Sequence, residues 1–195
     1  MLTQIARYFK FIRKRKGKVG VDAEFGIQTT LRILMLKKPN KSLRILIYDH
    51  DRFESKKSYQ WLKLSGQNVS VCDNYDTFLD ILEAETFDVV LFDLNQTEHE
   101  QYDSFHAIKS YRVMYGQLVK TVFILYTNQP YSFYLNEIEA ARVTGVIKKE
   151  KTKLPNQLFY ELTSMLGLTE KTAKDWVSTY NEKSNISSNI IPFRL

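Results

Sequence analysis

The sequence has little of the chemistry that depends on sulfur or imidazole. Of its 195 residues, one is a cysteine, Cys72, and three are histidines. A single thiol excludes an intramolecular disulfide and a multi-cysteine zinc site, and three histidines leave little for a His/Cys metal cage. No apolar run approaches the roughly 18 to 20 residues of a membrane-spanning helix, and the N-terminus lacks the apolar segment and small-residue cleavage site of a secretory signal. We therefore expect a cytoplasmic protein.

The composition is that of a globular chain, but its charge is unevenly distributed. Hydrophobic residues make up 44% of the chain and charged residues 26%, which is enough apolar material for one core. Residues 1–44 contain twelve Lys and Arg but two acids, a charge of +10, whereas the other 151 residues contain 16 basic and 20 acidic residues, a charge of −4. The net +6 therefore comes from a basic arm attached to a mildly acidic body. It does not by itself indicate a nucleic-acid partner.

Strands and helices are predicted to alternate between residue 44 and about residue 168. Short apolar runs rich in β-branched residues predict strands, and apolar residues at helical spacing predict helices. The predicted strands cover 44–48, 69–72, 88–93, 121–126 and 145–148. The predicted helices cover about 53–64, a segment capped by Asp76 with Phe78 to Leu82 on one face, and about 104–115, 133–142 and 156–166. Five strands alternating with five helices indicate a doubly wound, parallel α/β domain.

Polar residues follow most of these strands, at the point where each strand ends. The carboxyl ends of parallel strands meet at one edge of a sheet and form the ligand crevice of such folds. The residues predicted to lie there are two acids and a histidine after the first strand, an acid at the third, a hydroxyl at the fourth and an ammonium at the fifth: Asp49, His50, Asp51, Asp93, Thr127 and Lys149. Their joint placement predicts a functional site at this edge.

Four motifs in order resemble the receiver domains of two-component response regulators. The first motif, residues 44–51, is a strand that ends in acids, and the second, residues 88–94, has Asp93 at the position of the family's phosphoacceptor. The third, residues 123–128, has Thr127 at the position of the family's Thr or Ser, and the fourth, residues 141–150, has Lys149 at the position of its Lys. The resemblance covers about residues 43–167. It implies a flavodoxin-like fold: a five-stranded parallel sheet of strand order 2-1-3-4-5 with helices on both faces.

The resemblance also implies a chemistry, which is the formation of an acyl phosphate. Asp93 would accept a phosphoryl group from a histidine kinase or a phosphotransfer protein, and Thr127 and Lys149 would bind that group. Asp49 and Asp93 would hold Mg²⁺, which neutralises the accumulating charge. Such a protein is a switch and not a conventional enzyme. It would pass the phosphorelay signal by protein–protein contacts to an output protein, which the sequence does not identify.

The sequence departs from the family pattern around this site. His50 replaces the second acid, and because Mg²⁺ prefers oxygen ligands, its binding is expected to be weakened or absent. Asp51 could partly substitute, and His50 could itself be a metal ligand, although a solvated loop histidine is the simpler interpretation. The turn at 94–104 is long and acidic, Val146 replaces an aromatic residue and Glu150 replaces a proline. An alternative function is therefore a phosphorylation-independent pseudo-receiver that binds other proteins.

The arm at residues 1–42 allows several interpretations. Within residues 1–18, apolar side chains at helical spacing precede the basic run 13–16. This pattern is typical of a helix that lies on an anionic membrane surface, or of an arm that contacts the phosphates of a nucleic acid. A solvated basic tail is the simpler alternative, and Met35 could be a natural start, which would make the preceding residues an extension without a role in the switch.

The C-terminal segment, residues 168–195, is predicted to add one helix and a flexible tail. Thr169 is a plausible N-cap, Trp176 and Val177 would anchor the helix to the body, and residues 184–189 would be loose. The segment also resembles the recognition helix of helix-turn-helix regulators, but it is too short for a whole domain of that type. A DNA-binding transcriptional regulator that uses the arm or the Thr169 helix is therefore a third possible function.

Overall fold

A computed structural model describes three stretches of the chain, residues 42–94, 98–115 and 121–188. All of them belong to one structural unit of the chain. The expectations for the basic arm, for part of the turn after Asp93 and for the end of the tail concern residues 1–41, 95–97 and 189–195, which lie outside these stretches.

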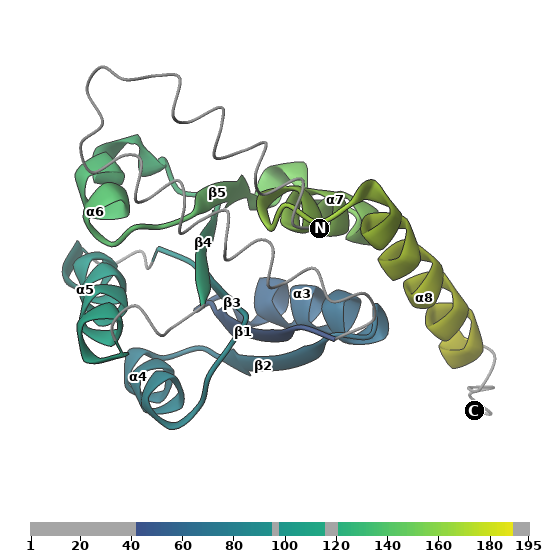
Figure 1. Ribbon diagram of the computed structural model, residues 1–195, viewed down its shortest axis with the longest axis horizontal. Helices are drawn as coiled ribbons and strands as arrows, with labels where there is room; N and C mark the ends of the chain where they lie inside the picture. The colour runs from purple at the N-terminus through teal and green to yellow at the C-terminus, as the bar shows by residue number, and fades with distance from the viewer. Residues whose placement is uncertain (1–41, 95–97, 116–120, 189–195) are drawn as a thin grey trace, which may run out of the picture. The chain divides into compact units, whose positions relative to one another are not determined.

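The five predicted strands form one parallel sheet. They are β1 (Arg44–Tyr48), β2 (Asn68–Cys72), β3 (Val89–Phe92), β4 (Val122–Thr127) and β5 (Gly145–Lys148). The strand order is β2-β1-β3-β4-β5, and every neighbouring pair is parallel (Figure 1). This order confirms the predicted flavodoxin-like fold. β3 and β4 are buried along their whole length, which explains why their sequences are nearly continuous in apolar residues.

Helices cover both faces of the sheet. They are α3 (Arg52–Leu64), α4 (Tyr75–Ala84), α5 (Glu98–Tyr115), α6 (Leu135–Ala140), α7 (Pro155–Met165) and α8 (Glu170–Ser188), with short 3-10 turns η2 (Tyr131–Tyr134) and η3 (Lys149–Lys151). Successive strand residues point to opposite faces. Ile45 and Ile47 therefore pack with residues of α3, α7 and α8, whereas Leu46 and Tyr48 pack with residues of α4 and α5 (Figure 1).

Three of the helices before α7 differ clearly from the predictions. α4 begins two residues earlier than expected, because Asn74, and not Asp76, caps it by accepting a hydrogen bond from the Thr77 backbone N–H at 2.8 Å. α5 begins at Glu98, six residues before the predicted start, in a polar stretch that has no apolar period. The helix predicted at 133–142 is a 3-10 turn followed by the short α6.

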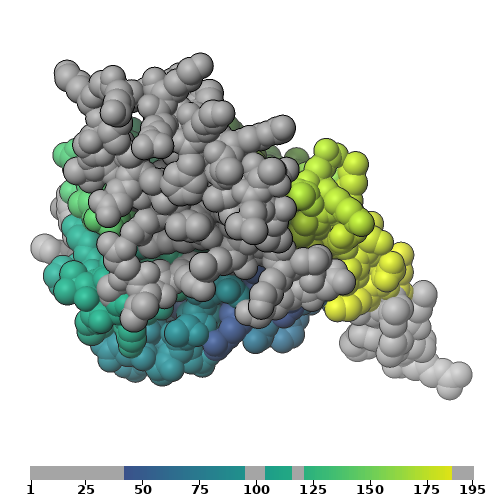
Figure 2. Space-filling view, in the orientation of Figure 1, coloured from purple at the N-terminus to yellow at the C-terminus, as the bar shows by residue number. Residues whose placement is uncertain are grey.

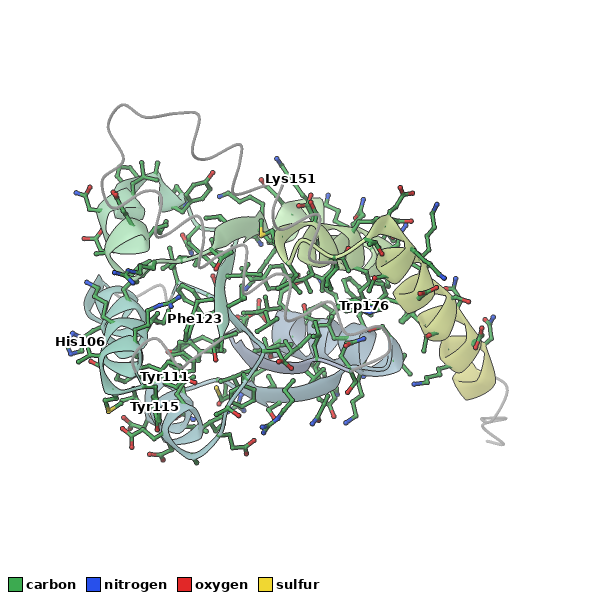
Figure 3. The ribbon with its side chains drawn as sticks, in the orientation of Figure 1. His106, Tyr111, Tyr115, Phe123, Lys151 and Trp176 are labelled. Carbon is green, nitrogen blue, oxygen red and sulfur yellow. The ribbon has the colours of Figure 1, made fainter. Side chains whose placement is uncertain are left out.

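α8 packs on the body as the sequence predicts. Its first turn is capped by Thr169, whose hydroxyl accepts a hydrogen bond from the Thr172 N–H at 3.3 Å. Trp176 is buried where α8 meets α7, edge-on to Phe159 with the ring centroids 6.0 Å apart (Figure 3). Val177 packs against the same cluster. The prediction of a loose segment from residue 184 was wrong as far as Ser188, because α8 continues to that residue.

Candidate functional site

The sheet register brings the predicted site residues together at the carboxyl ends of the strands. Tyr48 of β1 pairs with Phe92 of β3, so the next residues on the two strands, Asp49 and Asp93, lie side by side. Lys149 comes directly after β5, at the start of η3. Asp49 and Lys149, which are 100 positions apart in the sequence, are therefore neighbours in the fold.

One ammonium bridges both carboxylates. Lys149 Nζ donates to Asp49 Oδ2 at 2.7 Å and to Asp93 Oδ2 at 2.5 Å. The side chains of Lys149 and Asp49 are almost completely buried, whereas 17% of the Asp93 side chain is exposed. Backbone N–H groups bind the other carboxylate oxygens: Asp51 N donates to Asp49 Oδ1 and Leu94 N to Asp93 Oδ1. Asp93 is thus the carboxylate of the pair that is open to solvent.

Burial and charge act in opposite directions on these groups. Burial raises the pKa of Asp49 to about 6, although the neighbouring Lys149 ammonium lowers it. Burial would lower the pKa of Lys149, but the charges of Asp93 and Asp49 outweigh it and raise that pKa. Lys149 is therefore an ammonium at physiological pH, and Asp49 titrates at a higher pH than an ordinary aspartate.

Asp49 is expected to make the protein less stable as the pH rises. Because its pKa is raised from 3.8 to about 6 in the folded state, Asp49 holds its proton more tightly in the folded protein than in the unfolded chain. The protonated Asp49 therefore stabilises the fold. This stabilisation is complete below about pH 3.8 and is lost as the pH rises through 6. Denaturant unfolding of the wild type and Asp49→Asn, with chelator present, measures it. The stability of the wild type relative to the variant should fall from pH 4 to pH 6.5; a constant difference would contradict the burial of an ionisable Asp49.

Thr127, at the end of β4, is fully buried, and its hydroxyl oxygen already takes part in one hydrogen bond. Its hydroxyl oxygen accepts a hydrogen bond from the Gln129 backbone N–H at 3.0 Å, which folds the loop back over the strand end. A hydroxyl that accepts through its oxygen still has its own proton to donate. Thr127 can therefore bind one further acceptor at this edge of the sheet.

His50 and Asp51 have other roles in the described structure. The His50 ring is half-buried and packs edge-on to Tyr48, with Nε2 3.4 Å from the Tyr48 hydroxyl, so it is not the solvated loop histidine that the sequence suggested. Its Nδ1 is buried without a hydrogen-bond partner. Asp51 is exposed and caps α3: its Oδ1 accepts from Phe53 N at 2.9 Å and Glu54 N at 3.1 Å. Among the described residues no group of three or more acidic, histidine or cysteine side chains is placed to hold a metal ion.

One contact of the site was missed at the sequence level. The ring of Tyr126 lies 5.5 Å from Lys149 Nζ, measured to the ring centroid, on the face of the sheet that α3 and α7 cover. The only signal for it was an aromatic residue directly before Thr127 in a buried strand. The sequence could not show which residue the ring would meet.

Comparisons with known proteins identify the fold. No protein-family model matches the chain, and no curated protein sequence matches it. Among solved structures, the chemotaxis response regulator CheY4 of Vibrio cholerae is 21% identical, with 64% of this chain and 99% of that chain covered and a TM-score of 0.54. A CheY-like receiver domain protein from Methanospirillum hungatei is 19% identical, with 69% and 99% covered and a TM-score of 0.54.

A third similar structure is the BeF3-activated DrrB receiver domain, at 19% identity, with 65% of this chain and 99% of that chain covered and a TM-score of 0.51. These matches extend over nearly the whole length of each receiver domain. The chain therefore has the CheY-like fold of response-regulator receiver domains. No helix in the described stretches has the length and apolar character that crossing a membrane requires.

Proposed function

We propose that this protein is a phosphoacceptor switch of the response-regulator type, and that Asp93 accepts the phosphoryl group. The observation that carries the proposal is the Lys149 ammonium, which joins Asp49 and Asp93 at the carboxyl ends of β1, β3 and β5. Asp93 is the carboxylate with an exposed edge, so a donor can reach it. The Lys149 ammonium and the Thr127 hydroxyl, which still has a proton to donate, lie at the same edge of the sheet.

The transfer that we propose is an in-line displacement. An Asp93 oxygen attacks the phosphorus of a phosphohistidine, the P–N bond breaks, the imidazole leaves and an acyl phosphate forms. An ammonium has three N–H donors. Lys149 uses two of them on Asp49 and Asp93, and the third can bind a phosphoryl oxygen. The Thr127 proton can bind another.

The two carboxylates fit a weakly held Mg²⁺. Their Oδ2 atoms already converge on one cation, the Lys149 ammonium, and Mg²⁺ is commonly held by one or two carboxylates together with water and phosphate oxygens. Asp49 and Asp93 would be its ligands. When bound, the ion would neutralise charge on the transferring group. Among the described residues, neither of the two that follow Asp49 adds a third carboxylate, because His50 is not an acid and packs on Tyr48, and Asp51 caps α3.

We also propose the partners and the domain organisation of the chain. The donor is a histidine kinase or a phosphotransfer protein, and the signal passes to an output protein by direct contact, so the chain is a switch and not a turnover enzyme. Residues 43–167 form the receiver domain, with the basic arm at 1–42 before it and the C-terminal segment at 168–195, whose helix α8 packs on it, after it. We place the protein in the cytoplasm, where such donors act.

The test is phosphorylation from a small donor. The full chain is incubated with acetyl phosphate and Mg²⁺, and intact-protein mass spectrometry follows a mass increase that hydroxylamine removes, as it does for an acyl phosphate. We expect one labile phosphoryl group in the wild type and none in Asp93→Asn. Asp88→Asn is the control, because Asp88 lies at the opposite end of β3 and binds the Arg44 N–H. Equal labelling of Asp93→Asn would overturn the assignment.

Restoring the missing acid is expected to increase labelling. In His50→Asp a third carboxylate follows β1, and added negative charge strengthens the attraction of the site for a divalent cation. The yield of acyl phosphate at limiting Mg²⁺ should rise severalfold, and the excess should disappear with chelator. His50→Asn separates the added charge from the loss of the ring. If both variants label like the wild type, His50 does not limit metal binding.

A second candidate function is a phosphorylation-independent pseudo-receiver that acts by binding other proteins. It is favoured by the Lys149 ammonium, which binds both carboxylates at once, and by the use of Asp51 as a helix cap. This function predicts that neither acetyl phosphate nor a phosphohistidine donor labels the wild type with any divalent metal. Under that outcome, Asp93→Asn would leave the binding of protein partners unchanged.

A further inference from the structure

Behind the site, three buried hydroxyls from distant parts of the chain form one row. Ser58 comes from α3, Tyr126 from β4, and Thr152 follows η3. Ser58 Oγ lies 3.3 Å from the Tyr126 hydroxyl, which lies 3.0 Å from Thr152 Oγ1. Thr152 Oγ1 lies 3.1 Å from the Lys149 carbonyl oxygen. Ser58 and Thr152 have no exposed surface, and Tyr126 has 2%.

The direction of every hydrogen bond in this row follows from the number of protons. Each hydroxyl has one proton to donate. Because the Lys149 carbonyl can only accept, Thr152 gives its proton to that oxygen, and Tyr126 must then donate to Thr152. Ser58 donates in turn to Tyr126. Every hydroxyl in the row thus donates once, and the row ends at the backbone of Lys149.

The row holds the residue that carries the bridging ammonium. The Thr152 backbone N–H also donates to the Lys149 carbonyl, at 3.0 Å, so this carbonyl accepts two hydrogen bonds and closes the η3 turn. On the other side, the face of the Tyr126 ring lies 5.5 Å from Lys149 Nζ, where it attracts the cation. The same tyrosine therefore contacts the ammonium by its ring and supports the Lys149 backbone, through Thr152, by its hydroxyl.

We propose that Tyr126 and Thr152 are positioning residues that hold the Lys149 ammonium between Asp49 and Asp93. They do not touch the phosphoryl group; they act through Lys149. This role rests on the proposed phosphoacceptor site, but the hydrogen bonds of the row do not depend on whether Asp93 is phosphorylated. A buried hydroxyl that loses its partner is costly, and bonds in a row reinforce one another. Removing one hydroxyl should therefore loosen the ammonium.

The chain offers a matched control at the other end of β4. There the Tyr111 hydroxyl lies 3.3 Å from Thr121 Oγ1, which donates to the Phe87 carbonyl at 2.7 Å. Tyr111 and Thr121 are as buried as Tyr126 and Thr152, but they lie in the α4–α5 layer (Figure 3 labels Tyr111). Tyr111→Phe and Thr121→Val remove the same kinds of hydrogen bond without touching the site.

The first measurement needs neither metal nor donor. A held ammonium exchanges its protons slowly and gives its own ¹H–¹⁵N signal, which Lys149→Met assigns by its loss. We expect the signal in the wild type, in Thr152→Ser and in both control variants. In Tyr126→Phe and Thr152→Val its protons should exchange about tenfold faster, the factor for loss of one ordinary hydrogen bond. Unchanged exchange in Tyr126→Phe, which keeps the ring, or no signal in the wild type would overturn the proposal.

The second measurement is the rate of labelling by acetyl phosphate as a function of pH. Tyr126→Phe and Thr152→Val should be labelled about tenfold more slowly than the wild type. Thr152→Ser, which keeps the hydroxyl, and the controls Tyr111→Phe and Thr121→Val should be labelled at the rate of the wild type. Equal slowing in the controls would show a merely structural effect and overturn the proposal. If the wild type is not labelled at all, the proposed function fails, and the ammonium signal still decides whether Tyr126 and Thr152 hold Lys149.

Discussion

Replacing Lys149 with methionine should lower the free energy of unfolding by about 3–5 kcal/mol at neutral pH, the usual cost of removing one partner of a buried ion pair. The reason is the burial of Asp49, of which 1% of the side chain is exposed. Without the ammonium, its charge has no cation within hydrogen-bonding distance in the described part of the chain. The negative charge of Asp93 beside it adds repulsion.

The loss should depend on pH in a direction that the pKa of Asp49 determines. With Lys149 in place, this pKa is about 6, and because the ammonium lowers it, Lys149→Met raises it further. A carboxyl group whose folded pKa is raised binds its proton more tightly when folded, so acidification stabilises the variant relative to the wild type. The deficit of Lys149→Met should therefore be largest above pH 7 and shrink towards pH 4.

Urea or guanidinium unfolding at several pH values measures this deficit. The control is Lys174→Met, which breaks an exposed pair with Glu170 one turn away on α8. Exposed pairs of this kind contribute little, so this variant should unfold almost like the wild type at each pH. If Lys149→Met were equally stable, or if its deficit grew on acidification, the buried bridge between the two carboxylates would be contradicted.

Replacing Trp176 with alanine should lower the free energy of unfolding by about 3–5 kcal/mol, the range for large aromatic side chains in a core. Trp176 is 7% exposed and lies in the cluster that also contains Phe159 and Leu162 of α7 and Leu62 of α3. The space-filling view shows α8 on the opposite side of the described domain from α4 and α5 (Figure 2). Trp176 therefore contributes to the hydrophobic cluster on the face of the sheet that α3 and α7 cover, and not to the cluster on the face that α4 and α5 cover.

Phe133→Ala is the matched control for this substitution, because Phe133 is also aromatic but 80% exposed. It should change stability by less than about 1 kcal/mol, as surface substitutions generally do. Chemical unfolding of the three proteins, followed by circular dichroism, gives the comparison. A small effect of Trp176→Ala, equal to that of Phe133→Ala, would mean that α8 is an appendage on the surface and not part of the core.

The strands could be predicted from the sequence more accurately than the helices. β3 and β4 are buried on both faces, so almost every residue in them is apolar and their positions are clear. The start of α5 was missed because residues 98–103 are polar and show no helical period. The last turn of α8, residues 185–188, is also mostly polar. The strand order itself came from the resemblance to receiver domains and not from the strand patterns.

The site could be predicted only as a set of residues at one edge. Polar residues after strands placed Asp49, Asp93, Thr127 and Lys149 there, since parallel strands end on the same side. The sequence could not show that one ammonium would bridge two carboxylates, because that depends on the register of β1 against β3 and on the η3 turn. Nor could it show that Asp51 caps α3, since a carboxylate after a strand can also bind a metal.

We propose that Asp93 accepts the phosphoryl group, and locating the label on the chain tests this assignment. After reaction with acetyl phosphate and Mg²⁺, borohydride reduces an aspartyl phosphate to homoserine, and peptide mass spectrometry finds the modified position. We predict homoserine at position 93 and unmodified aspartate at position 49. Homoserine at another position would contradict the assignment of Asp93. The absence of homoserine, in a protein that has been exposed to a phosphohistidine donor as well, would also contradict it.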